Sequence, residues 1–311
     1  MIVHDPKIAV ELLSQGQLVG IPTETVYGLA ANALNADAVV KIFEAKKRPY
    51  FDPLIVHIAE MQQMERYAQN IHEKAYKLAE TFWPGPLTIV LPRRENIPDI
   101  VTSGLDSVGL RVPNHPLTLE LLRNLEFPLA APSANPFGYI SPTSASHVMD
   151  QLEGKVSAVF DGGTCAVGVE STIVHCAADG KITLLRQGGV PMERIEECVG
   201  KVEVQLHSSS NPKAPGMLAS HYSPRTKLVV GDIDKLIVEH GHLQIAYLSF
   251  QTKHDAWPGK VLSASGDLSE AARNLFAAMR ELDENKYDII LAELLPEMGI
   301  GRAINDRLIR A

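Results

Sequence analysis

The sequence predicts an α/β fold built as two domains joined by a linker. Short apolar runs rich in β-branched residues, typical of buried strands, alternate with segments of helical periodicity along the 311 residues. A stretch at 207–226, HSSSNPKAPGMLASHYSPRT, is dominated by Ser, Pro and Gly and lacks such periodicity, as linkers do. Predicted strands outnumber helices before it, so we expect a twisted mixed sheet at 1–206 and a small Rossmann-like α/β domain at 227–311.

The elements of the first domain follow from local signals. Asp37 is suited to cap a helix over 38–47, whose apolar residues recur at helical spacing. This helix should end near Arg48, because Pro49 disfavours helical geometry at the residue before it. We expect further helices at 9–13 and 61–82, and strands at 18–22, 54–58, 87–91, 107–112, 127–131, 157–160, 171–175 and 181–186.

The second domain shows a plainer alternation of strands and helices. Apolar residues recur every three or four positions over 268–282, and Asp267 with Glu270 predicts a capping box at the start of this helix. Because strands alternate with helices, we expect a parallel sheet. Its strands are predicted at 227–231, 243–249 and 287–294.

Composition argues against several classes of protein. Lys and Arg number 29 against 37 Asp and Glu, a net charge of −8, so the chain lacks the basic footprint of a general nucleic-acid binder. No apolar run approaches the ~20 residues of a membrane helix, and the first residues lack the pattern of a secretory signal. Cys165, Cys176 and Cys198 lack metal-site spacing, which favours buried thiols in a reducing cytoplasm.

Polar residues gather just after the predicted strands, where α/β folds build their sites. Thr23 and Thr25 in PTETVYGL are suited either to bond the backbone of a turn or to face a ligand. Lys46 and Arg48 would either offset the macrodipole at a helix end or clamp an anion. His57, alone in an apolar strand, is typical of a core residue but also a candidate ligand.

Two arginines end predicted strands. Arg111 and Arg186 are expected to be buried or half-buried, so each needs an anionic partner. The segment APSANP at 131–136 has the small and polar residues that let backbone N–H groups approach phosphates. With Lys46 and Arg48, these residues form a set of anion receptors without an evident covalent nucleophile. Such a set is typical of an enzyme that works by positioning and charge neutralisation.

Seven motifs follow one another along the first domain: PTETVYGLAANA, FEAKKRPYFDPLIVHI, FWPGPLTIVL, VGLRVPNHP, LAAPSANPFGYISPT, FDGGTCAVGVESTIV and LLRQGG. Together they resemble the YrdC-type threonylcarbamoyl-AMP synthases, and the likeness covers residues 10–190. The tail, with APGMLASHYSP and the ending GRAINDRLIRA, resembles the longer two-domain form of that family. The resemblance implies a YrdC-like catalytic domain at 1–206.

The resemblance also implies a reaction. L-threonine, bicarbonate and ATP would give L-threonylcarbamoyl-AMP and pyrophosphate, and a transferase complex would use the product to modify the adenosine next to the tRNA anticodon. Mg²⁺ would arrive with ATP, held by phosphates and water, with no protein metal ligand and no tightly bound cofactor. Whether the chain itself contacts tRNA is left open, and a cytoplasmic location is expected.

Individual roles are implied in the same way. L-threonine would be held by Thr23, Thr25, His57, Arg111 and Ser171. Lys46 and Arg48 would be the catalytic pair that holds bicarbonate and then the carbamate. ATP would be bound by Arg48, Asp52, Ser133, Asn135, Ser141, Arg186, His221 and Tyr222. The linker 207–226, which carries the last two, is expected to fold over the pocket and exclude water from the labile adenylate.

Two alternative functions are weighed beside this one. A carbamoyl-adenylate-forming carbamoyltransferase, as in hydrogenase maturation, carries a similar domain, but it adds acylphosphatase and Cys-rich regions that this sequence lacks. A non-catalytic RNA-binding module is disfavoured by the acidic balance and by the lack of interleaved basic and aromatic residues.

Overall fold

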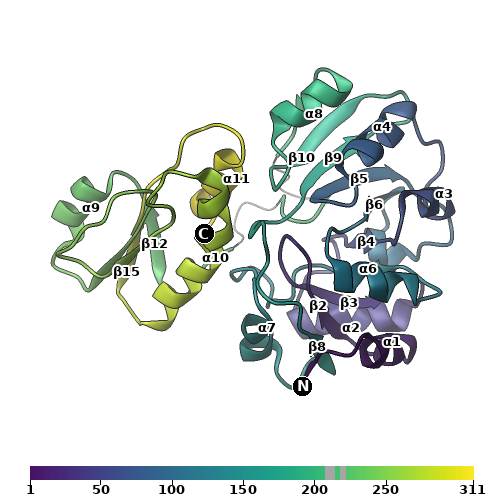
Figure 1. Cartoon of the computed structure of the whole chain (residues 1–311), viewed down its shortest axis with the longest axis horizontal. Helices are drawn as coiled ribbons and strands as arrows, with labels where there is room; N and C mark the ends of the chain where they lie inside the picture. The colour runs from purple at the N-terminus through teal and green to yellow at the C-terminus, as the bar shows by residue number, and fades with distance from the viewer. Residues whose placement is uncertain (207–213, 218–221) are drawn as a thin grey trace.

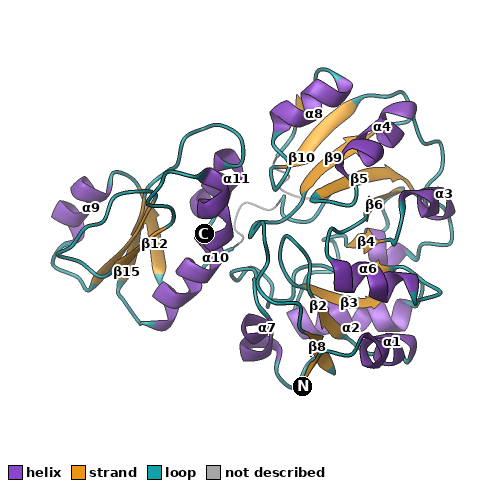
Figure 2. Ribbon diagram, in the orientation of Figure 1, coloured by secondary structure: helices purple, strands orange, loops and turns teal. Residues whose placement is uncertain are grey.

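The computed structural model describes residues 1–206, 214–217 and 222–311. They form one large and one small sheet, each with its own helices, and the parts lie side by side (Figure 1). Helices and strands alternate through both parts (Figure 2). The predicted α/β class, with a large mixed sheet and a second, smaller α/β unit, is confirmed.

The large sheet has eleven strands in the order β1-β8-β2-β3-β7-β4-β6-β5-β9-β10-β11. It is mixed, because β4 pairs with β6 and β5 with β9 in parallel, whereas β6 pairs with β5 and β9 with β10 antiparallel. Its strands are β1 (Ile2–Val3), β2 (Val19–Ile21), β3 (Gly28–Asn32), β4 (Ile55–His57), β5 (Leu87–Pro92), β6 (Ser107–Arg111), β7 (Leu129–Ala130), β8 (Ala158–Phe160), β9 (Thr172–Cys176), β10 (Ile182–Arg186) and β11 (Glu203–Val204).

Helices and short helical turns accompany this sheet. Asn35, not Asp37, caps the second helix, since its side chain accepts from the Ala38 N–H; Asp37 lies in the first turn. The helix ends at Lys46, and its cap residue Lys47 adopts a left-handed conformation one residue before Arg48. The elements are α1 (Pro6–Ser14), α2 (Ala36–Lys46), η1 (Met61–Gln63), α3 (Met64–Tyr67), α4 (Glu73–Phe82), α5 (Asp99–Thr102), α6 (Pro116–Arg123), α7 (Ala145–Leu152) and α8 (Met192–Val199).

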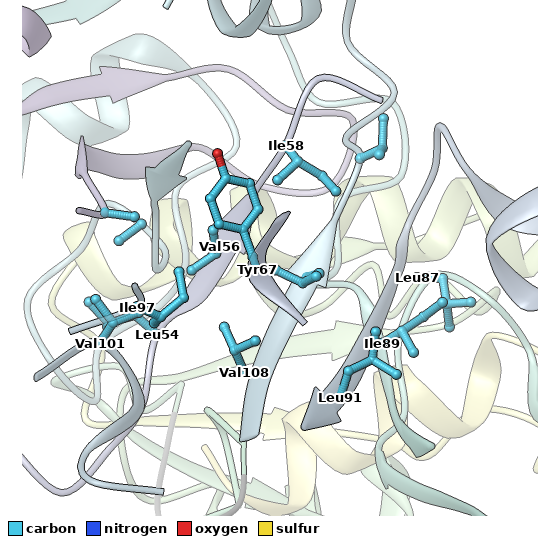
Figure 3. Packing of buried hydrophobic residues seen from close by; sticks show 14 of the residues in the cluster. Leu54, Val56, Ile58, Tyr67, Leu87, Ile89, Leu91, Ile97, Val101 and Val108 are labelled. Carbon is cyan, nitrogen blue, oxygen red and sulfur yellow. The ribbon is translucent and has the colours of Figure 1, made fainter. Parts of the chain in front are cut away.

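Strands β4, β6 and β5 present different chemistry on their two faces. Alternate side chains, among them Val56, Ile89 and Val108, pack into the main apolar cluster together with residues of α2, α4 and α8 (Figure 3). Because side chains alternate along a strand, His57 and Arg111 lie on the opposite face. Among the described residues, the apolar cluster on that face is small: Ile55, Val90, Ile173, Leu185, Ala214 and Met217. It is therefore the face with room for a site.

The small sheet is parallel throughout, as predicted, with the order β12-β15-β13-β14. Asp267 caps α10 by accepting from the N–H groups of Ser269 and Glu270, but the Glu270 side chain bonds Ser263 instead of closing the predicted capping box. The elements are β12 (Lys227–Val230), α9 (Ile233–His240), β13 (Ile245–Ser249), β14 (Gly259–Val261), α10 (Leu268–Glu284), β15 (Ile289–Ala292) and α11 (Gly301–Ile309). Among the described residues, no helix is long and apolar enough to cross a membrane.

The second domain docks against the first through α10 and α11 (Figure 1). Ile140 and Val169 of the first domain belong to the same apolar cluster as Phe276 and Ile304 of the second. Gly168 lies so close to α10 that a Cβ atom there would come within 2.4 Å of the Cα atom of Arg273. Only glycine fits this approach, and the two domains form one closely packed body there.

Candidate active site

A cavity opens on the face of the large sheet opposite its main core, with about 470 Å³ of empty space when the open solvent at its mouth is included. Loops that follow strands form its walls, together with α2's C-terminal loop and parts of the linker. The lining residues are Thr25, Val26, Arg48, Ile55, His57, Arg111, Ala131, Pro132, Ser133, Glu170, Ser171, Arg186, Pro215, Gly216 and Tyr222. Eight of the residues predicted for the site are thus brought together from segments far apart in the sequence.

Three arginines line this cavity although each is buried: Arg48 is 6% exposed, Arg111 4% and Arg186 7%. Arg48 pairs with Asp52 at 2.8 Å and donates to the carbonyls of Asp52 and Pro53. These contacts use its Nε and Nη2 atoms, so the remaining Nη1 group is the one without a partner in the described chain. Burial lowers the pKa of Arg48 and raises that of Asp52, against the attraction between the two charges.

Arg111 has the anionic partner that its position in the strand predicts. Its Nη2 lies 2.7 Å from Glu24 Oε2 and also donates to Thr25 Oγ1, while its Nε donates to the Gly85 carbonyl. Within the described residues its Nη1 makes no hydrogen bond. Arg111 is therefore fixed in place while its Nη1 group, with two N–H donors, is left for a ligand.

Arg186 is held by neutral oxygens, and the expectation that it meets an anion stays a prediction about a ligand. Its guanidinium donates to the Ser171 carbonyl, the Ser171 hydroxyl and the Pro215 carbonyl, and no carboxylate of the described residues forms an ion pair with it. A β-bulge between Leu184 and Arg186 shifts the register of β10, so that Arg186 lies opposite Ile173 on the cavity face. Three neutral oxygens thus hold a positive charge at the cavity.

Thr25 lines the cavity, and Thr23 lies behind it. The Thr23 hydroxyl donates to the Val26 carbonyl at 2.6 Å and is 2.8 Å from the Thr25 hydroxyl, which accepts from Arg111. Thr23 therefore follows the backbone-turn alternative, and it acts on the cavity only through Thr25.

Lys46 does not line the cavity. It is 1% exposed, and its Nζ donates to the carbonyls of Ser133 and Asn135, both at 2.6 Å. Burial and the neighbouring Arg48 lower the pKa of Lys46 well below its ordinary value. The ammonium thus braces the 133–135 segment, with one of its three N–H groups left over.

His57 ends β4 directly beside Arg111 of β6, since the two are register partners. Its Nδ1 atom is buried and has no hydrogen-bond partner in the described part of the chain. Burial and the Arg111 charge lower the pKa of His57 to about 3, so the ring is neutral at physiological pH. A neutral ring with an unsatisfied nitrogen at a cavity wall can take a hydrogen bond from, or give one to, a ligand.

The other residues predicted to bind ATP divide into two groups. Ser133 is at the wall, whereas Asp52, Asn135 and Ser141 lie behind it. Asn135 donates to two carbonyls and leaves its own buried side-chain oxygen without a partner, and Ser141 donates to Glu170.

Parts of the linker reach the cavity. Pro215, Gly216 and Tyr222 line it, and Tyr222 is fully buried. Gly216 has φ +80° and lies against Arg186 and the Tyr222 hydroxyl. His221 lies outside the described residues.

Three residues at or near the cavity were not predicted. Glu24 and Glu170 lie within motifs that the sequence singles out. The signal for them would have been that buried arginines need carboxylate partners. Arg307 of α11 is fully buried and binds Glu170 from the second domain. No sequence signal marks it, because its place depends on how the two domains dock. The described residues contain no group of three side chains suited to hold a metal ion.

Comparison with known proteins bears on this site. Residues 11–188 match a family model described as "Telomere recombination", and residues 190–311 match one described as "Threonylcarbamoyl-AMP synthase, C-terminal domain". A threonylcarbamoyl-AMP synthase of Pyrococcus abyssi is 44% identical, covering 98% of this chain and 93% of the relative. The chain belongs to the threonylcarbamoyl-AMP synthase family. The family resemblance noted in the sequence is therefore confirmed.

A threonylcarbamoyl-AMP synthase from Bacillus subtilis is 43% identical, and the match covers 99% of this chain and 93% of the relative. The crystal structure of P. abyssi Sua5 complexed with L-threonine superposes with a TM-score of 0.94 at 42% identity, covering 98% of this chain and 93% of that one. Membership of the threonylcarbamoyl-AMP synthase family makes this chain an enzyme that transfers AMP.

Proposed function

We propose that this enzyme makes L-threonylcarbamoyl-AMP from L-threonine, bicarbonate and ATP, with release of pyrophosphate. The observation that carries the proposal is the convergence of Arg48, Arg111 and Arg186 on one cavity. An amino-acid carboxylate, a carbamate and a triphosphate would meet there, and such like charges repel by several kcal/mol at contact distance. Buried, fixed cations remove that cost without reorganisation. The L-threonine bound to P. abyssi Sua5 supports the threonine half of the proposal.

The threonine side of the cavity is assigned to Arg111 and its neighbours. The Nη1 group of Arg111 would take the carboxylate, and the hydroxyls of Thr25 and Ser171 and the open nitrogen of His57 would meet the polar groups around it. Thr23 would act by orienting Thr25.

The carbamate is assigned to Arg48 at the cavity wall, with Lys46 supporting the site from behind. The threonine nitrogen would bond to the carbon of bicarbonate with loss of water, and a carbamate oxygen would then attack the α-phosphorus of ATP. The bond from that phosphorus to the bridging oxygen would break, and pyrophosphate would leave. Arg48 would neutralise the carbamate through its Nη1, while Lys46 would hold the Ser133 loop against the phosphates.

The ATP side is assigned to Arg186, Ser133 and Tyr222 at the wall. Asp52, Asn135 and Ser141 would support them from behind, Asp52 through Arg48 and Ser141 through Glu170. Mg²⁺ bound to the triphosphate would neutralise part of its charge, with phosphate oxygens and water as its main ligands. The described linker residues Pro215, Gly216 and Tyr222 would cover this side of the cavity.

The product is a mixed anhydride that water destroys, so a partner must consume it promptly. We place the enzyme in the cytoplasm, ahead of a transferase complex that moves the threonylcarbamoyl group to the adenosine next to the tRNA anticodon.

The decisive test is pyrophosphate release with ATP, bicarbonate and each of the twenty amino acids in turn. Threonine should give the highest rate, and mass spectrometry should find threonylcarbamoyl-AMP. If no amino acid stimulates release, or if the adenylate forms without bicarbonate, the proposed reaction is wrong.

A further inference from the structure

The second domain places one arginine against the cavity of the first. Arg307 lies on α11, and its side chain is fully buried. Its Nε and Nη2 atoms each lie 3.0 Å from Glu170 Oε2, and its Nη1 donates to the Gln187 carbonyl at 2.8 Å. A residue of the second domain is thus bonded to two segments of the first.

Glu170 is a carboxylate at the wall of a cavity assigned to anions. Its other oxygen accepts from the Ser141 hydroxyl at 2.5 Å. Burial opposes its ionisation, but the charges of Arg307 and Arg186 and the Ser141 hydroxyl bring the pKa of Glu170 below its usual range. Glu170 is therefore negative at neutral pH, and without Arg307 that charge would face the triphosphate.

Arg307 also touches a second wall of the cavity. Its guanidinium carbon lies 5.0 Å from the centre of the Tyr222 ring, within the range of a cation–π contact. Tyr222 and Glu170 both line the cavity, so one side chain from the second domain contacts both.

We infer that Arg307 is a positioning residue for the ATP polyphosphate, through which the second domain completes the nucleotide side of the cavity. It neutralises Glu170 and holds Tyr222 without touching the substrate. The inference rests on the proposed function. By reciprocity, ATP should in turn strengthen the docking of the second domain.

A charge-balanced pair of variants tests it. Arg307→Met leaves Glu170 negative, whereas Asp306, the other carboxylate paired with Arg307, keeps its ion pair with Arg310. The KM for ATP should therefore rise at least about tenfold, while the KM for threonine changes little. Adding Glu170→Gln to this variant restores a neutral pair, since Gln can still accept from Ser141, and most of the ATP affinity should return. A merely structural role for Arg307 would lower the stability of Arg307→Met, but the KM for ATP of the folded variant would stay at the wild-type value.

Arg302→Met is the matched control. Arg302 is on the same helix and pairs across the same domain interface with Glu193 of α8, neither of which lines the cavity. Its loss should leave the KM for ATP unchanged. An equal rise in both arginine variants would mean that domain docking in general is responsible, which would overturn the specific role of Arg307.

Two further outcomes decide the matter. If the KM for ATP is unchanged in folded Arg307→Met, or if the double variant is no better than the single one, the inference is wrong. If Arg307→Met does not fold, Glu170→Gln is compared with Glu170→Gln/Arg307→Met. Equal ATP affinity of these two variants supports the inference, and a large loss of affinity in the double variant overturns it. Calorimetric titration with ATP alone compares the ATP affinities of the same variants without turnover. It therefore tests the inference about Arg307 even if the proposed reaction is wrong.

Discussion

Arg111 and Glu24 form an ion pair of 2.7 Å in which the side chains are only 4% and 6% exposed. Such a buried pair costs desolvation, so it is weak as a stabilising device. Its value here is orientation: Glu24, Thr25 and the Gly85 carbonyl fix the guanidinium of this cavity residue and leave Nη1 without a hydrogen bond among the described residues.

Replacing Arg111 with Met should raise the KM for L-threonine at least about tenfold, because a hydrogen bond to a charged group contributes about 1.5–3 kcal/mol. The KM for ATP should change much less. Initial rates of pyrophosphate release over a threonine titration measure both.

Arg94→Met controls for this loss of an arginine, since Arg94 donates to the carbonyls of Glu65 and Ala68 and does not line the cavity. Because Arg111→Met strands Glu24, Arg111→Met/Glu24→Gln should recover stability but not threonine affinity. If folded Arg111→Met or folded Arg111→Met/Glu24→Gln shows a wild-type KM for threonine, Arg111 does not bind the carboxylate.

The role of Lys46 can be tested by its effect on kcat. Lys46→Met removes the ammonium that holds the 133–135 segment and leaves two carbonyls without their donor. We expect kcat to fall at least about 100-fold, as for the loss of a preorganised donor. The adjacent Lys47 is exposed, so Lys47→Met removes the same charge from the surface and should keep wild-type kcat. Circular dichroism confirms folding, and comparable kcat values in the two variants would refute the role of Lys46.

His57 should make stability depend on pH. Its pKa is about 3 in the folded chain against an ordinary 6.5. As pH falls below 6.5, His57 becomes protonated in the unfolded chain but stays neutral in the folded chain. The free energy of unfolding therefore drops by up to about 1.4 kcal/mol per pH unit. This loss continues until pH nears 3. In His57→Gln the contribution disappears, which urea unfolding at several pH values would measure.

His147 gives a useful comparison for that experiment. Burial and Arg280 lower its pKa to about 4, so His147→Gln should flatten the profile only above that value. If His57→Gln keeps the wild-type slope between about pH 4.5 and 6.5, His57 does not enter the folded state as a neutral buried ring.

Much of the large sheet could be predicted because its strands are apolar runs bounded by turn residues. β3 was missed, since GLAAN has no β-branched residue. The need of Arg111 for an anion could be predicted because a buried charge requires a partner, and Glu24 is that partner. The neutral oxygens that hold Arg186 follow no sequence pattern. The bulge that turns Arg186 to the cavity face depends on pairing with β9, which is a property of the assembled sheet.

The linker provides the final test, at Gly216. Its φ of +80° is strained for any other residue, and an added Cβ would lie 3.0 Å from the Tyr222 hydroxyl and 3.2 Å from Arg186 Cδ. Gly216→Ala should therefore displace Tyr222 or Arg186 and raise the KM for ATP severalfold. Gly104 has a similar φ of +77° with nothing within 4 Å of its Cβ position, so Gly104→Ala reproduces the backbone strain of about 1 kcal/mol without the crowding.

Both glycine variants should have a lower midpoint of thermal unfolding than the wild type. Only Gly216→Ala should bind ATP more weakly, as titration calorimetry would show. The crowding at Gly216 involves side chains on the nucleotide side, so the KM for threonine should stay near the wild-type value. Equal ATP affinity in the two variants would mean that the segment 214–217 packs on the cavity without shaping it, and the proposed cover of the cavity would lose its structural basis.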